Sequence, residues 1–329
     1  MLDPTKIDLT VSIVSHNNRE MLKECLVSIF SDPMNIPASD GSLNLEIVVV
    51  LNVPGDGSAD MLRASFPGVK IIENQTPAGF SANHNRALRG ARGDYLIILN
   101  DDVIVHPGCF AELLHFLRSH PDAGAAGPRT LNTDGSLQVS CFRLPTLAVL
   151  FHDAFFLSSF FPSVTAIGGY KAWAHDATRE VGHILGACMA VPRQVFEAAG
   201  GFDERFFLYY EEADLCKRIR ESGKKIFFHP DAVITHHGGA TISRLGDEAN
   251  HNFRTGLNTY YAKHFGRASL AGVYTLNMYG AAVRLAIYAV MSPFSKNLRD
   301  VFSEPRRRYG AILKWYVSSI FGKRKTKQP

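Results

Sequence analysis

An asparagine and two aspartates stand directly after a run of apolar residues: LIIL at 96–99 leads into Asn100-Asp101-Asp102. Adjacent carboxylates at the end of a buried strand carry charge that is costly unless a cation joins it. Oxygen ligands suit Mg²⁺ or Mn²⁺, which commonly bridge to substrate phosphates. Two aspartates can also cap a helix or lie in a solvated turn, but their position after a strand favours a divalent metal site.

Three more carboxylates lie close together in Glu211-Glu212-Ala213-Asp214, at the predicted start of a helix. They could simply complement the helix dipole. The aromatic run FFLYY at 206–210 precedes them, however, and burial beneath such side chains would raise the pKa of a carboxyl group towards the value that a general base needs. The pattern therefore favours a catalytic carboxylate over a purely structural one.

Two further polar segments could reach a ligand. His236-His237-Gly238-Gly239 closes a predicted strand, where the glycines would let the backbone approach a ligand and an imidazole would favour Mn²⁺ somewhat over Mg²⁺. Asn74 and the segment 79–85, which contains Asn83, lie at the start of a predicted helix, where polar groups can hold phosphate or ribose oxygens. Both segments also have an ordinary structural interpretation, as satisfied histidines and as helix caps.

The elements that must position these residues alternate along the chain. Apolar runs predict strands at 9–15, 45–51, 69–72 and 94–99, and the stretches between and after them predict helices at about 19–30, 58–66, 79–91 and 107–119. This alternation indicates an α/β fold, a doubly wound and mostly parallel sheet with helices on both faces. Ligands bind such sheets beyond the carboxyl ends of the strands. The rule brings together three segments: His16-Asn17-Asn18, the stretch from Asn52 to Ser58, and Asn100-Asp101-Asp102.

The middle of the chain is less regular. GHILGACMAV at 182–191 predicts a core strand, 200–223 a loop and an amphipathic helix, and 225–237 a pair of short strands. The segment 142–173 is crowded with phenylalanine, but its apolar part is too short and too interrupted to indicate a membrane span. We expect there either a buried helix or hairpin, or a flap beside the substrate that could dip into a membrane.

Composition and charge narrow the class of protein. The 329 residues, 46% of them hydrophobic and 20% charged, are enough for one large domain with an appendage or for two ordinary domains. Five scattered cysteines form no CxxC pair, which argues against a zinc site or a disulfide framework and for a reducing compartment. No signal peptide is recognised, so we expect a cytoplasmic protein.

The net charge of +4 conceals a basic tail. Residues 296–329 hold ten Lys or Arg and two acidic residues, a local charge of +8, which leaves −4 for the rest. Such a tail indicates an anionic partner, and lipid headgroups are favoured over nucleic acid. Residues 269–295 are apolar, but Arg284 near their centre would cost roughly 2.5–3.5 kcal/mol inside a bilayer. We therefore favour a helix lying on the membrane surface, with a helix packed on the protein or a true span as alternatives.

Together these motifs resemble the family-2 glycosyltransferases of the GT-A fold, especially the rhamnosyltransferase-like branch of bacterial cell-surface polysaccharide synthesis. The resemblance covers roughly residues 9–245 and rests on VSIVSHNN, DGS, PAGFSANHNRAL, GDYLIILNDDV with HPG, LGACMAVPRQVFEAAGGFDERFFLYYEEADLCKRIRESG and HHGGAT. It implies a GT-A catalytic domain at 1–245, with a nucleotide-sugar half at about 1–105 and an acceptor half at about 106–245. A helical, basic, membrane-associating extension would follow at 246–329.

The resemblance also implies roles for single residues. Glu212, with Glu211 beside it, matches the general base; Asp102 would be the main metal ligand and His236 would complete the metal site. Contacts to the donor nucleotide are implied for His16, Asn17, Asn52, Asp56, Asn83, Asn100 and Asp101. The acceptor would lie against Gly186, Ala187 and Asp214.

The implied activity is an inverting, metal-dependent transfer of a sugar, with rhamnose from dTDP-rhamnose as the favoured donor. The acceptor would be a hydroxyl of a glycan or a polyprenyl-diphosphate-linked sugar, and the cofactor Mn²⁺ or Mg²⁺. Other expected partners are an anionic membrane surface but no nucleic acid, with the protein peripheral on the inner face of the plasma membrane.

Some residues depart from the family pattern, and these departures concern which nucleotide the donor carries. Leu51 stands where the family usually has an aspartate, Val53-Pro54 interrupt the usual polar run, and Glu212 replaces an aspartate. A non-catalytic nucleotide-sugar-binding protein is one alternative. A sugar-nucleotide nucleotidyltransferase is another, although it would need a glycine-rich basic loop where this chain has SHNNRE.

Overall fold

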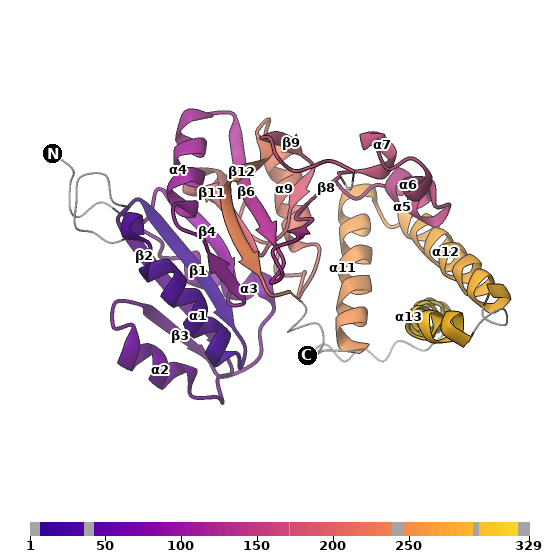
Figure 1. Ribbon diagram of the computed structural model, residues 1–329, viewed down its shortest axis with the longest axis horizontal. Coiled ribbons are helices and arrows are strands. Elements are labelled where there is room, and N and C mark those ends of the chain that lie inside the picture. Colours follow the sequence, from indigo (N-terminus) through magenta and orange to yellow (C-terminus); the bar gives the residue numbers. More distant parts are fainter. Residues whose placement is uncertain (1–6, 36–42, 171, 239–246, 292–295, 322–329) are drawn as a thin grey trace. The chain divides into compact units, whose positions relative to one another are not determined.

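The computed structural model describes residues 7–35, 43–170, 172–238, 247–291 and 296–321. The chain divides into two compact units, the first formed by Met1–Leu144 and Ala174–Gly256 and the second by Pro145–Trp173 and Leu257–Pro329 (Figure 1). This division differs from the predicted one at residue 245, because the segment 145–173 groups with the C-terminal helices.

The first half of the sheet is parallel, as the apolar runs predict. Its order is β3 (Lys70–Asn74), β2 (Leu45–Asn52), β1 (Leu9–Ser15) and β4 (Tyr95–Asn100). Ser15 pairs with Leu51 and Val14 with Asn100, so β1, β2 and β4 end at the same level. The three polar segments that follow these strands therefore start from one edge of the sheet.

The second half of the sheet is mixed. Beyond β4 the order continues with β11 (Cys188–Pro192), β6 (Ala123–Leu131), β12 (Lys225–His236) and β5 (Val103–Val105). β11 runs antiparallel to both β4 and β6, whereas β12 is parallel to β6 and antiparallel to β5. Short strands complete this half: β7 (Leu137–Gln138) on β6, β9 (Arg179–Val181) on β12, and β8 (Cys141–Phe142) paired with β10 (His183–Ile184).

Helices cover both faces of this sheet (Figure 1). Side chains of β2 alternate between the two sides: Val49 belongs to the larger core cluster, whereas Val48 and Val50 pack with Ala87 of α3. The helices of the unit are α1 (Arg19–Phe30), α2 (Ser58–Ser65), α3 (Phe80–Leu88), α4 (Cys109–Ser119), α8 (Arg193–Ala198) and α9 (Glu211–Glu221), with a 3-10 turn η1 (Pro33–Asn35). The doubly wound α/β prediction is confirmed.

Several strands differ from the sequence prediction. The run 182–191, predicted as one core strand, is divided between β10 and β11. The segment 225–237 was expected to form two short strands, but β12 is one strand with an irregularity between His229 and Val233. Pro230, which has no N–H to donate, lies in that interruption. Strand β6 was not predicted, because AGAAGPRTL lacks the large β-branched residues that mark a strand.

The second unit is helical. It contains α5 (Leu147–Ala154), α6 (Leu157–Phe160), α7 (Thr165–Gly168), α12 (Ser269–Met291), α13 (Lys296–Phe321) and the last part of α11 (Asp247–Phe265). Arg284 of α12 joins these helices: it donates to the carbonyl oxygens of Asp153 at 2.7 Å and Gly280 at 3.0 Å, and its guanidinium lies 4.1 Å from the Phe156 ring centre. Within the described ranges, no helix combines the length and the apolar character needed to cross a membrane.

The phenylalanine-rich segment is only partly buried. The ring of Phe155 stacks on Tyr279 at 4.7 Å, whereas Phe160 and Phe161 are 74% and 50% exposed. The expectation of a buried helix or hairpin is therefore not met over the whole segment, which instead forms three short helices with exposed aromatic side chains. Contact with a membrane or a substrate stays a prediction.

Candidate active site

Asp102 and His236 face each other where β4 and β12 end. Asp102 Oδ1 lies 3.2 Å from His236 Nε2, and the Asp102 backbone carbonyl accepts a hydrogen bond of 3.0 Å from the His237 N–H. The short distance lacks the alignment of a hydrogen bond, so the buried Oδ1 has no hydrogen-bond partner. Asn100 Nδ2 lies 3.5 Å from the same histidine nitrogen. Gly239, the last residue of the predicted motif, lies outside the described residues.

The histidine is held in one orientation by Gln138 of β7. Gln138 Nε2 donates to Asn132 Oδ1 at 2.8 Å and to the His236 carbonyl at 3.2 Å, which leaves Gln138 Oε1 to accept from His236 Nδ1 at 2.6 Å. With its proton on Nδ1, the ring directs the lone pair of Nε2 at the carboxylate of Asp102. Two acceptors that face each other at this distance repel unless a proton or a cation lies between them.

A second contact links this edge to the predicted base. The backbone N–H of Asn100 donates to the Ala187 carbonyl at 3.0 Å, at the point where β11 begins beside β4. A Cβ built on the preceding residue, Gly186, would lie 4.0 Å from the Glu212 Cβ and 3.3 Å from Phe80 Cζ. The loop at 186–187 thus touches the ends of β4, α3 and α9.

Asp101 lies at the same edge and is almost fully buried. Burial raises the pKa of Asp101 to about 6, although the side chains of Ser15 and Asn18 act in the opposite direction and Asp102 adds to the rise. The three residues Asn100, Asp101 and Asp102 are therefore brought to the end of β1 as well as to that of β12.

The two glutamates at the start of α9 are buried carboxyl groups. Glu211 is 4% exposed and Glu212 is partly exposed, and one oxygen of each has no hydrogen-bond partner. Burial raises the pKa of both, and the charge of Glu212 raises that of Glu211 further. Because two such neighbours cannot both ionise easily, the deeper Glu211 holds a proton more readily and Glu212 is the better base.

Backbone strain directly precedes this pair. Tyr209 and Tyr210 both have φ of 71°, a left-handed conformation that is uncommon for bulky residues. Tyr210 is the N-cap of α9. Burial, and then the charges of Glu211 and Glu212, raise the pKa of Tyr209. Such a turn at a helix start is a conformation that persists only where the surrounding structure enforces it.

On the donor side, the loops after β1 and β2 are tied together. His16 Nδ1 hydrogen-bonds the Asn52 carbonyl at 2.6 Å, and the Asn17 side chain accepts from the Gly55 N–H at 2.8 Å. Asp56 accepts from the Arg19 N–H at 2.8 Å and from Ser58; burial opposes, but these bonds lower the pKa of Asp56. The structure brings the predicted residues together, and their contact with a nucleotide stays a prediction.

The asparagines of this side are largely engaged with each other. Asn52 Oδ1 accepts from Asn74 and from the Ala78 N–H, and Asn83 accepts from Asn74 and donates to the Ala78 carbonyl. They hold the loop before α3 in place. The donor roles predicted for Asn52 and Asn83 therefore depend on groups that already have a structural use.

Asp214 has a clear structural contact. Its carboxylate is fully buried and binds Arg218 one turn along α9, with a distance of 2.8 Å to Nη2. Arg218 in turn donates to the Ala199 carbonyl. This pair fixes α9, and the contact between Asp214 and an acceptor stays a prediction.

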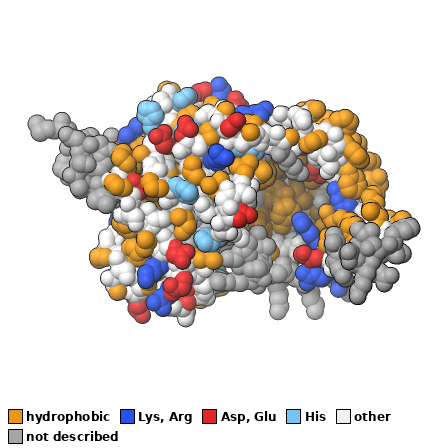
Figure 2. Space-filling model, in the orientation of Figure 1, with side chains coloured by type: hydrophobic (Ala, Val, Ile, Leu, Met, Phe, Trp, Pro, Cys, Tyr) orange, Lys and Arg blue, Asp and Glu red, His pale blue; other side chains and the backbone are white. Residues whose placement is uncertain are grey.

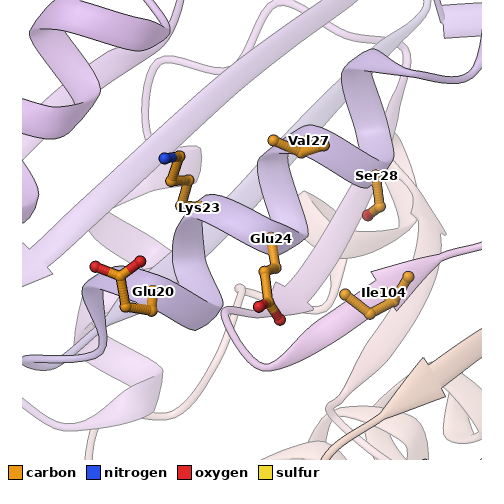
Figure 3. A pocket seen from close by; sticks show the side chains of 6 residues that line it. All are labelled: Glu20, Lys23, Glu24, Val27, Ser28 and Ile104. Atoms are coloured by element: carbon orange, nitrogen blue, oxygen red, sulfur yellow. The ribbon is translucent and has the colours of Figure 1, made fainter.

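Two surface pockets lie elsewhere. One of about 440 Å³ lies along α1 and is lined by Glu20, Lys23, Glu24, Val27, Ser28 and Ile104 (Figure 3). The other, of about 470 Å³, is lined by residues at the start of β4 and the end of β11, among them Asp94 and Pro192. Neither contains a predicted site residue. We place the candidate site at the carboxyl edge because the converging polar groups are there, not in either depression.

Sequence reasoning missed three contacts of this site, which are made by Gln138, by Phe253 and by the backbone of Phe207 in the aromatic run 206–210. The N–H of Phe80 donates to the Phe207 carbonyl at 2.7 Å, so the start of α3 touches the loop that leads to the glutamates. Phe253 touches both tyrosines of the strained turn. No local pattern marks these residues, because their partners are 98, 127 and about 44 positions away in the chain.

A comparison with known families decides the identity. The sequence model described as Glycosyl transferase family 2 matches residues 10–196, more than half of the chain. The chain belongs to this family. The family resemblance of the motifs is confirmed, and the protein is a glycosyltransferase.

The relatives of this glycosyltransferase agree with that assignment. It is 29% identical over 228 residues to the N-acetylglucosaminyl-diphospho-decaprenol L-rhamnosyltransferase of Mycobacterium tuberculosis, covering 66% of the chain and 73% of the relative. It is 22% identical to rhamnosyltransferase WbbL of Escherichia coli, covering 69% and 82%. The mannosyltransferase PcManGT from Pyrobaculum calidifontis, solved with GDP-Man and Mn²⁺, matches with a TM-score of 0.55 and 19% identity over 98% of the chain and 90% of that structure. This last likeness shows the GT-A fold.

Proposed function

We propose that this glycosyltransferase is metal-dependent and inverts the configuration at the anomeric carbon. The observation that carries the proposal is that these residues lie along one edge of the sheet. Asp102 and Asn100 both lie close to His236. Asn100 in turn bonds to Ala187, and the neighbouring Gly186 lies beside Glu212. This arrangement would place cation ligands near the departing diphosphate and a base near the acceptor hydroxyl that displaces it.

The residues fit a divalent cation. Asp102 Oδ1 is a buried acceptor without a hydrogen-bond partner, and the lone pair of His236 Nε2 faces it at 3.2 Å. Among the described residues, no group of three or more His, Cys, Asp and Glu is placed to hold a metal, so the remaining ligands would come from phosphate oxygens and water. When bound, Mn²⁺ or Mg²⁺ supplies positive charge to the departing diphosphate.

Glu212 would act on the acceptor. Its carboxylate removes the proton from an acceptor hydroxyl as that oxygen attacks C1 of the donor sugar. The bond from C1 to the diphosphate breaks on the opposite face, and the nucleoside diphosphate leaves with the electron pair. Gly186 would leave room for the acceptor, because a side chain there would crowd Phe80 and occupy the space beside Glu212.

The names of the relatives support a choice of donor and acceptor. Both curated relatives carry rhamnosyltransferase in their names, and one name specifies an N-acetylglucosaminyl-diphospho-decaprenol acceptor. We infer that this chain transfers rhamnose from dTDP-rhamnose to a polyprenyl-diphosphate-linked sugar in cell-surface polysaccharide synthesis. Leu51 stands in place of the usual aspartate of the nucleotide pocket, so a test of the donor has to vary the nucleotide.

A panel of nucleotide sugars tests the proposal. Thermal unfolding with dTDP-rhamnose, UDP-glucose, UDP-N-acetylglucosamine and GDP-mannose, each with and without Mn²⁺, should show one donor that raises the Tm only with metal. That donor is then incubated with a polyprenyl-diphosphate-linked N-acetylglucosamine. Binding without transfer or hydrolysis would favour the non-catalytic alternative, and binding without metal would contradict the metal site.

The second unit carries features of a membrane-binding surface, and we propose that it lies on anionic lipid. Exposed cations lie on α13 at Arg306, Arg307, Arg308 and Lys314, and the same helix ends in exposed Val317, Ile320 and Phe321. Figure 2 shows hydrophobic side chains over much of the visible surface of α12. Basic and apolar groups on one helical unit suit the interface of a bilayer. Residues 322–329 of the predicted basic tail lie outside the described residues.

A further inference from the structure

The turn before the glutamates needs an external support. Tyr209 and Tyr210 are left-handed, with φ of 71° at both positions, and Tyr210 caps α9. The conformation of this strained pair sets the direction of the first turn of α9, which carries Glu211 and Glu212. Bulky residues keep such a conformation only where neighbouring structure over-determines it. The contacts of this turn therefore decide where the carboxylates lie.

Helix α11 supplies these contacts through its first part, which belongs to the same unit as the turn. The ring of Phe253 lies 5.7 Å from that of Tyr209 and 5.2 Å from that of Tyr210. One helical turn later, the backbone at Gly256 approaches the turn so closely that a Cβ would lie 2.4 Å from the Tyr209 carbonyl oxygen and 3.3 Å from Tyr210 Cδ2.

The identity of residue 256 supports this interpretation. Gly256 lies in the middle of the 19-residue helix α11, where glycine is the least favourable residue except proline. The close approach to the Tyr209 carbonyl explains its presence, because any side chain would push the helix and the turn apart. Phe253, three residues earlier, lies on the same face of the helix.

We propose that Phe253 and Gly256 are positioning residues that clamp the Tyr209–Tyr210 turn and thereby hold Glu212 in place for proton removal. The inference rests on the proposed role of Glu212 as the base. The contacts described for Phe253 and Gly256 are with Tyr209 and Tyr210, so loss of the clamp should act on the chemical step and not on donor binding.

The test compares Gly256→Ala and Phe253→Ala with two controls in the full-length protein. Gly310→Ala places the same methyl group in helix α13, where a Cβ would meet nothing within 4 Å. Phe253→Tyr keeps the ring, and Phe253 is 44% exposed, so the added hydroxyl can reach water. Steady-state kinetics use Mn²⁺, the donor that the nucleotide-sugar panel identifies and a polyprenyl-diphosphate-linked N-acetylglucosamine.

We expect the two clamp variants to lower kcat by about tenfold to 100-fold, as a displacement of the base by about an ångström does. The donor KM should change by less than about threefold, and both controls should resemble the wild type. If Gly256→Ala loses its cooperative thermal transition, the kinetics of Phe253→Ala alone test the clamp. Unchanged kcat in every folded clamp variant would overturn the inference.

A second readout separates the clamp from the base assignment. In protein labelled with ¹³C at the glutamate carboxyl groups, Glu211→Gln and Glu212→Gln assign two resonances, which are then titrated. Opening the turn admits water, so the apparent pKa values of the pair should fall in Gly256→Ala and stay unchanged in Gly310→Ala. If Glu212→Gln retains full kcat, the base role fails, whereas an unchanged titration in both clamp variants refutes the clamp.

Discussion

Gly186 and Glu212 are neighbours in the candidate site: a Cβ on the glycine would lie 4.0 Å from that of the glutamate, an ordinary van der Waals contact. The residue after Gly186 accepts a hydrogen bond from the Asn100 N–H, two positions before Asp102. The proposed base and the proposed metal ligand are 110 residues apart in the sequence, yet one hydrogen bond and the contact between positions 186 and 212 connect their segments.

Replacing Glu212 by glutamine should lower kcat by roughly 10²–10⁴-fold, the range that general base catalysis contributes. Donor affinity, measured by thermal stabilisation, should stay nearly unchanged. Burial raises the pKa of the Glu211–Glu212 pair, so wild-type kcat should increase with pH through the apparent pKa of the pair. Glu221→Gln, at the exposed end of the same helix, is the matched control. Parallel loss of donor binding in Glu212→Gln would argue against the base role.

Replacing Gln138 by leucine should weaken Mn²⁺ binding by about 10–100-fold, the usual effect of losing the partner of a metal-binding histidine. Without the acceptor on Nδ1, the proton of His236 is free to move to Nε2, where it blocks the lone pair that faces Asp102. The measurement is the Mn²⁺ concentration that gives half-maximal donor-dependent stabilisation.

Asp102→Asn serves as the reference for Gln138→Leu, and it should abolish the dependence of donor stabilisation on Mn²⁺. Asp134→Asn is the control, because the hydrogen bonds described for the Asp134 carboxylate stay within its own turn, to Ser136. Wild-type Mn²⁺ dependence in Gln138→Leu would show that the imidazole does not contribute to the site.

Much of the N-terminal half could be predicted, because its strands are continuous apolar runs whose ends carry polar residues. Helix α1 begins and ends at the predicted residues 19 and 30, and β1 at 9 and 15. Strand β6 could not be predicted, since its small residues are required by close packing against segments that are distant in the sequence. A Cβ on Gly124 would lie 2.3 Å from Ile219 Cγ2 of α9, and one on Gly127 would lie 3.0 Å from Ile184. Glycine there reflects close packing of a helix and a strand, which local propensity does not encode.

The site was predictable in its residue types but not in its supports. Asp102, Glu212 and His236 follow from strand ends and from motif resemblance. The tautomer set by Gln138 and the left-handed turn at Tyr209 depend on contacts between segments far apart in the sequence. Only the fold brings these together.

Glu46, at the opposite edge of the sheet, should make stability depend on pH. Its carboxylate is almost fully buried and accepts hydrogen bonds from Thr10 at 2.7 Å, from Lys70, and from Arg92. Burial alone would raise the pKa of Glu46, but these bonds lower it from 4.5 to about 2. The stabilisation is therefore complete above about pH 4.5 and is lost as the pH falls through about 2.

Glu46→Gln should accordingly lower the free energy of unfolding at pH 7 by about 1–3 kcal/mol, because a buried hydrogen-bonded charge is lost. In urea titrations the difference from the wild type should shrink as the pH approaches 2. Glu180→Gln, which removes a surface pair with Arg220, should cost less than about 1 kcal/mol. A difference that does not vary with pH would contradict the lowered pKa.

Membrane attachment of the second unit should depend on charge. Replacing Arg306, Arg307 and Arg308 by glutamine removes three exposed cations from α13. Since each contributes about 1 kcal/mol near an anionic surface, binding to vesicles of phosphatidylglycerol and phosphatidylcholine should weaken roughly 100-fold. The difference should disappear at high salt, where surface charges are screened. A control with the same change in net charge replaces the exposed Lys23, Arg63 and Arg89 of the first unit, and it should bind like the wild type. Equal losses in both triple variants would mean that net charge, not the surface of α13, draws the protein to lipid.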